Sequence, residues 1–160
     1  MQWNRKYNYP SSIRAILNGK RHYDLGSEKL PSVTTILNAT QSEEKKASIQ
    51  SWKDRVGYKR AEVIMREAST RGSSMHDYLE KFLLGKLNLD LLGDNTRERM
   101  MADQIIENGL RNKLSEIWAT ECVLYYPGKY AGAADCIGIY ESHETIIDFK
   151  QTNKPKKEEW

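Results

Sequence analysis

The hydrophobic period changes once along this chain, and that change constrains the fold more than any other feature. Between residues 31 and 118, apolar side chains recur at spacings of three and four, the pattern of amphipathic helices. Segments 120–126, 130–140 and 144–151 are instead rich in Val, Ile, Tyr and Thr with a period of two. Short turns separate them, which predicts an antiparallel three-strand meander. Helices followed by a sheet define an α+β domain.

Capping and breaking residues divide the helical part. Pro31 is expected to open a short helix, and Ser42 is an N-cap for a helix that Gly57 ends. Two further helices are predicted on either side of Gly72, and the last helix is predicted over 96–118.

Length and composition limit the class of protein. The 160 residues, 39% hydrophobic and 29% charged, suit one globular domain and exclude collagen-like, low-complexity and wholly disordered chains. No apolar stretch approaches the ~20 residues of a membrane helix, and the first residues lack the apolar run of a signal peptide. Cys122 and Cys136 form no CxxC pair, so we expect small core residues in a reducing, cytoplasmic compartment.

Positive charge gathers at the two ends of the chain. The first 21 residues contain five basic residues and no acid, and four lysines lie between residues 150 and 157. Aromatic residues are interleaved with both groups, as in surfaces that follow a nucleic-acid backbone and stack on its bases. The alternative is two solvated, poorly ordered ends. The five basic residues of the first group are Arg5, Lys6, Arg14, Lys20 and Arg21.

The third predicted strand carries charge where a core strand would be apolar. Asp148 and Lys150 are two residues apart and so point to one face, while Ile147 and Phe149 point to the other. An Asp–Lys surface pair on an amphipathic strand has the same pattern, so this feature alone leaves both interpretations open.

A second carboxylate, Asp135, precedes Asp148 by one hairpin, so neighbouring strands can bring the two acids together. Converging carboxylates repel each other unless a cation lies between them, and oxygen ligands suit Mg²⁺ or Mn²⁺. Lys150 could then stabilise charge on a phosphate or position an attacking water. The small residues at 131–134 would let a ligand approach the strand closely.

The segment GAADCIGIYESHETIIDFKQTNKP at 132–155 resembles the PD-(D/E)xK nuclease core, in the RecB-like branch that contains phage exonucleases. In that family a G-x-x-D run precedes a hydrophobic strand with D-x-K. Upstream, RGSSMHDYLE at 71–80 is similar to the R-G-T/S-x-x-H-x-x-x-E helix of the same branch. LPSVTTIL at 30–37 resembles a phage-exonuclease segment.

The resemblance implies roles for individual residues. It implies metal binding by Asp135 and Asp148 and catalysis by Lys150, which matches the roles inferred from the residues themselves. It also makes His76 a candidate metal ligand. The alternative for His76 is a partly buried histidine bonded to a backbone carbonyl.

Two further acids are candidates for supporting roles. Glu80 shares a helix face with Gly72 and His76, but it is equally interpretable as a solvated helix acid. Glu121 could orient Lys150 or a metal-bound water, or it could be an exposed strand residue.

The RecB-like branch continues past D-x-K into a helix with a Q-x-x-x-Y motif and a further strand, whereas this sequence stops at Trp160. The resemblance therefore implies a core that lacks both. Because an unpaired sheet edge invites pairing, we expect a homo-oligomer or a second chain that completes the core. The expected organisation is one nuclease domain over 1–160, divided into a basic N-terminal segment (1–30), a mainly helical part (31–118), a catalytic meander (119–152) and the start of a truncated helix (153–160).

Together these features predict a metal-dependent DNA exonuclease of phage type with a restriction-endonuclease-like core and Mg²⁺ or Mn²⁺ as cofactor. The expected partner is DNA, single-stranded or at its ends, and not a membrane. A phage-encoded chain would act in the host cytoplasm. The rival hypothesis is a non-catalytic nucleic-acid-binding protein or an inactive fragment of a split nuclease.

Overall fold

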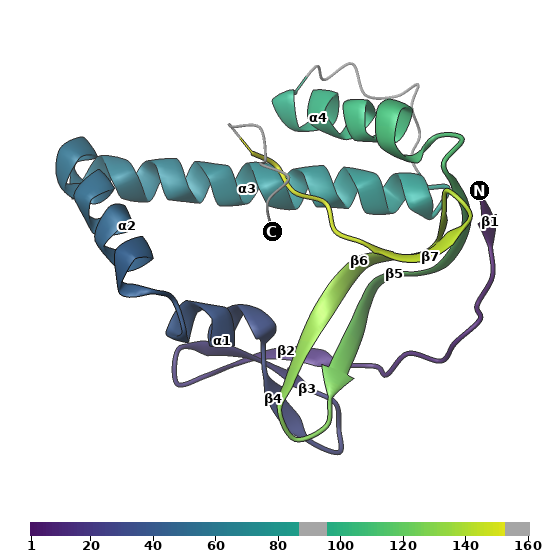
Figure 1. Cartoon of the computed structure of the whole chain (residues 1–160), viewed down its shortest axis with the longest axis horizontal. Coiled ribbons are helices and arrows are strands. Elements are labelled where there is room, and N and C mark those ends of the chain that lie inside the picture. The colour runs from purple at the N-terminus through teal and green to yellow at the C-terminus, as the bar shows by residue number, and fades with distance from the viewer. Residues whose placement is uncertain (87–95, 153–160) are drawn as a thin grey trace. The chain divides into compact units, whose positions relative to one another are not determined.

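The computed structural model of this chain describes residues 1–86 and 96–152. Within them, four α-helices and two β-sheets form a mixed α+β fold in which the helices largely precede the main strands (Figure 1). This confirms the α+β class. The helix start predicted at 153–160 lies outside the described residues.

Local capping explains the first two helices. α2 (Glu43–Val56) begins as predicted, because the side chain of Ser42 accepts a hydrogen bond from the Lys45 backbone, and it ends at Gly57, whose φ is 88°. The prediction for α1 (Val33–Ala39) was wrong at its start, since Ser32 is the N-cap. Pro31 instead ends a strand, where its fixed φ is equally acceptable.

A single helix, α3 (Tyr58–Leu83), replaces the two helices predicted on either side of Gly72. The buried residues Ala61, Met75 and Leu79 all lie on it. Gly72 does not break the helix; a Cβ there would lie 3.4 Å from the side-chain amide nitrogen of Gln151. That distance is an ordinary van der Waals contact, so Gly72 lies beside Gln151 within a continuous helix and is not a stop signal.

The last predicted helix was too long. α4 (Arg97–Ile105) passes into one π-helical turn, η1 (Ile106–Leu110), and the chain is already extended at Leu114. Leu110, Leu114 and Ile117 are all buried. Their apolar spacing continues a helical pattern while the backbone has changed, so period alone misplaced this boundary.

The larger sheet has the strand order β1-β5-β6-β7. Its strands are β1 (Gln2–Trp3), β5 (Leu114–Tyr126), β6 (Tyr130–Tyr140) and β7 (His143–Ile147). β6 and β7 are antiparallel, as predicted, whereas β1 pairs with β5 in parallel and makes the sheet mixed. The Trp3 indole N–H donates to the Leu83 carbonyl at 2.9 Å, which fastens the start of the chain to the end of α3.

The smaller sheet lies in the N-terminal segment that the sequence marked only as basic. β2 (Ile13–Leu17), β3 (Lys20–Asp24) and β4 (Lys29–Pro31) form an antiparallel three-stranded sheet. Arg14 lies over the Tyr23 ring, with 5.9 Å between guanidinium carbon and ring centroid. Residues 13–21 of the first basic group therefore lie in the β2–β3 hairpin and not in a poorly ordered end.

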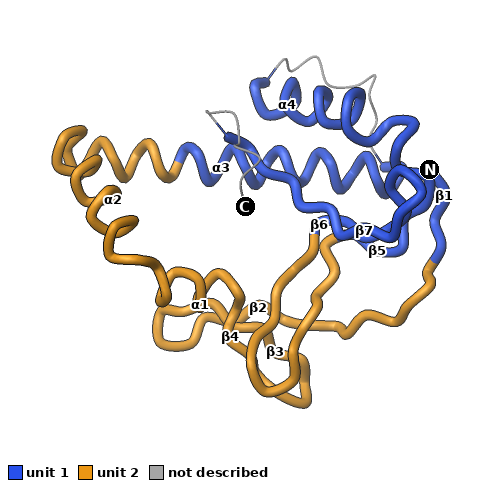
Figure 2. The backbone as a smooth tube through the Cα atoms, viewed as in Figure 1, with its two compact units in different colours: residues 1–4, 67–120, 135–160 blue, residues 5–66, 121–134 orange. Residues whose placement is uncertain are grey.

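The chain divides into two compact units (Figure 2). The first contains residues 1–4, 67–120 and 135–160, and its core joins buried residues of α3, α4, η1, β5 and β6 with Phe149. The second contains residues 5–66 and 121–134, with a small core of Tyr23, Leu30, Val123 and Ala131. Each unit thus has its own apolar centre.

The predicted small core residues Cys122 and Cys136 are buried free thiols. None of the described helices is long and apolar enough to cross a membrane.

We predict that Gly138→Ala will destabilise the first unit by at least ~2 kcal/mol, because a strand glycine here is needed for close approach of backbone. A Cβ at this position would lie 2.0 Å from the Glu116 carbonyl oxygen on β5, so the two strands would have to separate. Urea unfolding measures the effect. Gly109→Ala is the control, since its added Cβ meets only the Ile105 side chain at 3.8 Å, and equal stability of the two variants would contradict the prediction.

Candidate active site

His76 lies on α3 with both ring nitrogens occupied. Its Nε2–H donates to the Phe149 carbonyl oxygen at 2.8 Å, and its ring packs edge-on against the Phe149 ring, with centroids 6.2 Å apart. Nδ1 lies 3.5 Å from Oδ1 of Asp135. The carbonyl contact fits the alternative of a structural histidine. It also directs Nδ1 toward Asp135: a protonated ring donates a hydrogen bond from Nδ1 to the carboxylate, whereas a neutral ring offers Nδ1 to a cation, an orientation that outer-shell partners of metal-binding histidines commonly provide.

Asp135 lies on β6 and is held from two sides. Its Oδ2 accepts a hydrogen bond from the Phe149 backbone N–H at 2.6 Å. Burial raises the pKa of Asp135, but the hydrogen bonds from His76 and Phe149 and the positive charges of His76 and Lys150 outweigh it, so the pKa lies below its ordinary value. Asp135 is therefore a carboxylate at neutral pH.

A third ligand atom joins this pair. One ligand atom from each of His76, Glu121 and Asp135 lies within 4.8 Å of the other two. Glu121 directly follows Thr120 on β5 and has a left-handed φ of 46°, which is uncommon for a residue other than glycine. Such a backbone interrupts the alternation of the strand and redirects the side chain. Two carboxylates and one imidazole form an oxygen-rich donor set that fits Mg²⁺ or Mn²⁺.

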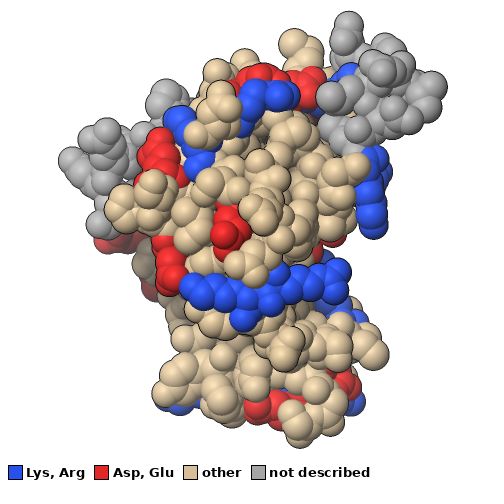
Figure 3. All heavy atoms as spheres, turned by 90° about the vertical axis from the view of Figure 1, so that its right-hand side faces the viewer, with Lys and Arg blue, Asp and Glu red and all other residues tan. Residues whose placement is uncertain are grey.

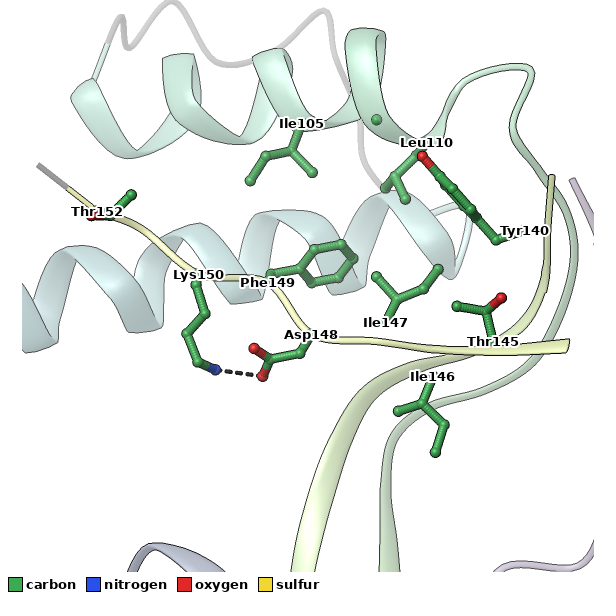
Figure 4. A pocket seen from close by; sticks show the side chains of 11 residues that line it. Ile105, Leu110, Tyr140, Thr145, Ile146, Ile147, Asp148, Phe149, Lys150 and Thr152 are labelled. Atoms are coloured by element: carbon green, nitrogen blue, oxygen red, sulfur yellow. Dashed lines mark hydrogen bonds and ion pairs between the residues drawn. The ribbon is translucent and has the colours of Figure 1, made fainter. Parts of the chain in front are cut away.

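Asp148 and Lys150 lie just beyond the last residue of β7, in extended chain rather than in the predicted strand. Their side chains point to one side, and the Lys150 ammonium donates to Oδ1 of Asp148 (Figure 4). Phe149 points to the other side, so the alternation predicted for this segment persists. The Asp148 carboxylate is not part of the three-residue group within the described residues.

The same segment, Asp148 and Lys150 included, lines a pocket of about 490 Å³ (Figure 4). Its walls are mainly apolar and include Ile105, Leu110, Tyr140, Ile147 and Phe149. Phe149 thus belongs to both places, since it lines the pocket while its backbone holds His76 and Asp135.

Glu80 is partly buried on α3 and is not a member of the three-residue group, so its supporting role stays a prediction. The small residues before Asp135 serve internal packing at two positions. Ala131 forms a bridge to Ser32, and a Cβ on Gly132 would lie 3.2 Å from Val33.

Sequence reasoning missed the backbone of Phe149 as the connector of the site. Its N–H binds Asp135 and its carbonyl binds His76. The D-x-K spacing contained this information. In an extended chain the middle residue directs its side chain to the opposite face, here into the core, so its backbone lies beside the two flanking side chains.

No family model matches the sequence. Mitochondrial genome maintenance exonuclease 1 of Mus musculus is 29% identical over 152 residues, which cover 86% of this chain and 44% of the mouse protein. The Homo sapiens protein of that name is 24% identical over 132 residues, covering 79% of this chain and 38% of the human protein.

The Xenopus tropicalis protein is 24% identical over 159 residues, with 94% of this chain and 44% of the frog protein covered. The chain therefore spans less than half the length of these curated relatives. The resemblance found in the sequence motifs is confirmed: the chain is a distant homologue, over most of its length, of mitochondrial genome maintenance exonuclease 1, a PD-(D/E)xK nuclease.

Proposed function

We propose that this chain is a metal-dependent deoxyribonuclease that hydrolyses phosphodiester bonds as an exonuclease of phage type, on a restriction-endonuclease-like core. The observation that carries the proposal is the group of His76, Glu121 and Asp135, whose histidine is oriented through its Nε2 by a backbone carbonyl. Distant homology to an exonuclease supports the same reaction class. The proposed place of action is the cytoplasm, and the proposed substrate is DNA, single-stranded or at its ends.

In this proposal, His76 Nδ1 and the carboxylates of Asp135 and Glu121 hold Mg²⁺ or Mn²⁺. When bound, the ion activates water and neutralises charge on the phosphate. Asp135 is suited to this role because it is ionised at neutral pH, and the Phe149 N–H keeps its second oxygen in place.

Asp148 and Lys150 act as a pair in the proposed reaction. The Lys150 ammonium is held by Asp148 in this structure. An incoming phosphate is a second anion that competes for Lys150, whose charge then offsets the negative charge that develops on the phosphate as water attacks. Asp148, once relieved of this contact, has an oxygen available for a cation, which is the ligand role that its D-x-K position implies.

A fluorescent-DNA degradation assay tests the proposal. Linear and circular substrates, labelled at each end, are incubated with Mg²⁺ or Mn²⁺ and in parallel with EDTA. We expect metal-dependent loss of linear DNA from its ends, with circular DNA retained. A folded chain that binds DNA but degrades neither substrate with either metal would instead support a non-catalytic nucleic-acid-binding protein or an inactive fragment.

We predict that His76→Ala lowers activity most at low metal concentration, because mass action partly compensates for a lost ligand. Rates measured across a Mn²⁺ titration test this. His143→Ala is the matched control, since the exposed His143 contacts a carbonyl two residues away in its own turn. Equal loss for His76→Ala at every Mn²⁺ concentration would indicate the structural alternative.

Basic residues in the first 21 positions are proposed to follow the DNA backbone. On the face shown in Figure 3, Lys and Arg side chains form one band and further separate patches, and Asp and Glu occur in separate patches. We predict that DNA affinity falls steeply as the salt concentration rises. A variant without the five positive charges should have a smaller slope of log affinity against log salt, by about 0.7 for each phosphate contact that is lost. The residues replaced are Arg5, Lys6, Arg14, Lys20 and Arg21. An unchanged slope would show that these residues are only solvated surface.

A further inference from the structure

A second pocket of the first unit, about 510 Å³ in volume, is lined by basic and amide side chains. α3 contributes Arg71, and α4 with its π-helical turn contributes Arg97, Gln104 and Asn108. The last three share one helix face, since they are spaced by seven and four residues. Gln151 adds another amide from the segment that follows Lys150.

The charge of this pocket has one sign. Among the described residues no Asp or Glu lines it, while Arg71, Arg97 and Lys150 do. Neither Arg71 nor Arg97 has an ion-pair partner within residues 1–86 and 96–152. By contrast, most other described basic residues of this unit have an acidic partner. A carboxylate lies within 4 Å of each of Lys81, Arg99, Arg111 and Lys113.

The pocket favours binding of an anion, because its two arginines have no acidic partners and lie beside amide donors. A guanidinium pairs with phosphate through two parallel hydrogen bonds. Met75, Met101 and Ile105 give the same pocket an apolar part. A phosphate flanked by an apolar sugar or base fits both features, whereas a free inorganic ion would use only the first.

We propose that the pocket between Arg71 and Arg97 binds a phosphate of a nucleic-acid strand, next to the phosphate at Lys150. The inference rests on the proposed function, because it takes the strand at Lys150 to be the substrate. Two sources share this chemistry, namely an internal phosphodiester and a terminal phosphomonoester. Because Lys150, Gln151 and Thr152 line the pocket, one strand can reach both places.

The test is a binding measurement in EDTA, so that no cleavage occurs. Fluorescence anisotropy follows an internally labelled single-stranded oligonucleotide with hydroxyls at both ends, with a 5′-phosphate, or with a 3′-phosphate. We expect the double variant R71Q/R97Q to bind at least ~10-fold more weakly than the natural chain and to have a salt slope smaller by about 0.7 or more.

The charge-matched control is R111Q/K113Q, which removes two positive charges whose side chains already contact Glu107 and Glu141. R71K/R97K keeps the charge but loses the paired geometry of the guanidinium, so it should restore only part of the affinity. Circular dichroism verifies that each variant is folded. If R71Q/R97Q does not fold, R71K/R97K alone carries the comparison, with an expected loss of several-fold.

The arms distinguish the two sources. If R71Q/R97Q loses affinity only for one of the two phosphorylated oligonucleotides, the pocket binds a terminal phosphomonoester. If it loses affinity equally for all three oligonucleotides, the pocket binds an internal phosphodiester. Equal affinities of R71Q/R97Q and R111Q/K113Q would overturn the proposed site. Nuclease activity is not read here, so a chain that binds through these arginines but never cleaves would contradict the proposed function and leave this site intact.

Discussion

Replacing Asp135 with Asn should reduce metal-dependent cleavage of DNA by at least ~100-fold, because a charge aimed at the reacting centre is lost. Asn keeps a carbonyl oxygen that can accept the Phe149 N–H, so the hydrogen bond that positions this residue can persist. The negative charge is lost in full at neutral pH, because the pKa of Asp135 lies below its ordinary value. Turnover with saturating Mn²⁺ measures the effect.

Asp103→Asn is the control for this prediction. Asp103 lies on α4 of the same unit and contacts only Arg99, at 3.8 Å, among the ion pairs of the described residues. Its loss should leave turnover within about twofold, since surface ion pairs contribute little. If Asp135→Asn folds normally and turns over as fast as Asp103→Asn, Asp135 has no part in the reaction.

Lys150→Ala and Asp148→Asn should each lower turnover by ~100-fold or more while leaving folding and DNA affinity largely intact. Both side chains are exposed, so neither contributes a core contact whose loss would unfold the unit. Lys150 supplies charge at the phosphate, and Asp148 holds the ammonium before the substrate arrives. Single-turnover cleavage, with anisotropy for DNA affinity, separates the chemical step from binding.

The chain offers a second exposed Lys–Asp pair as control. Lys81 and Asp77 lie on α3 with 2.7 Å between ammonium and carboxylate. Lys81→Ala and Asp77→Asn remove equal charges from the same unit and should change turnover by no more than about twofold. Near-natural turnover by either Lys150→Ala or Asp148→Asn would exclude the catalytic pair, whatever the control shows.

The sheet was the part of the fold that sequence predicted best. β6 has the predicted bounds, whereas β5 begins earlier than predicted, at Leu114, and β7 runs over His143–Ile147 in place of the predicted 144–151. Turn residues at 127–129 and 141–142 bound both strands, so the signals were local. β1 could not be foreseen, because two residues carry no periodicity and their partner on β5 is more than 100 residues away.

The wrong helix boundaries have a common cause. Local sequence signals were compatible with more than one structure, and tertiary contacts determined which one formed. Gly72 looks like a helix stop, yet the helix continues through it and Gln151 packs beside it. The apolar spacing at 110–117 suits helix or strand, and the pairing of β1 with Glu116 and Ile117 resolves it as strand.

The site was predictable in part. Asp135 and His76 were chosen from sequence and do contact each other. The close group contains Glu121, which the sequence marked only as a supporting acid, because nothing in TECVLYY reveals a positive φ. Asp148, expected beside Asp135, pairs with Lys150 instead, and its role as a metal ligand stays a proposal.

Direct measurement of Mn²⁺ binding tests the central claim, which is that His76, Glu121 and Asp135 hold a divalent cation. The free Mn²⁺ signal in electron paramagnetic resonance is titrated with the natural chain, with Asp135→Asn, with His76→Ala and with the Asp103→Asn control. We expect saturable binding by the natural chain and the control, and affinity lower by at least ~10-fold in the other two, because loss of even an outer-shell partner costs ~10–100-fold. Equal affinity in all four proteins, or no binding by the folded natural chain, would contradict it.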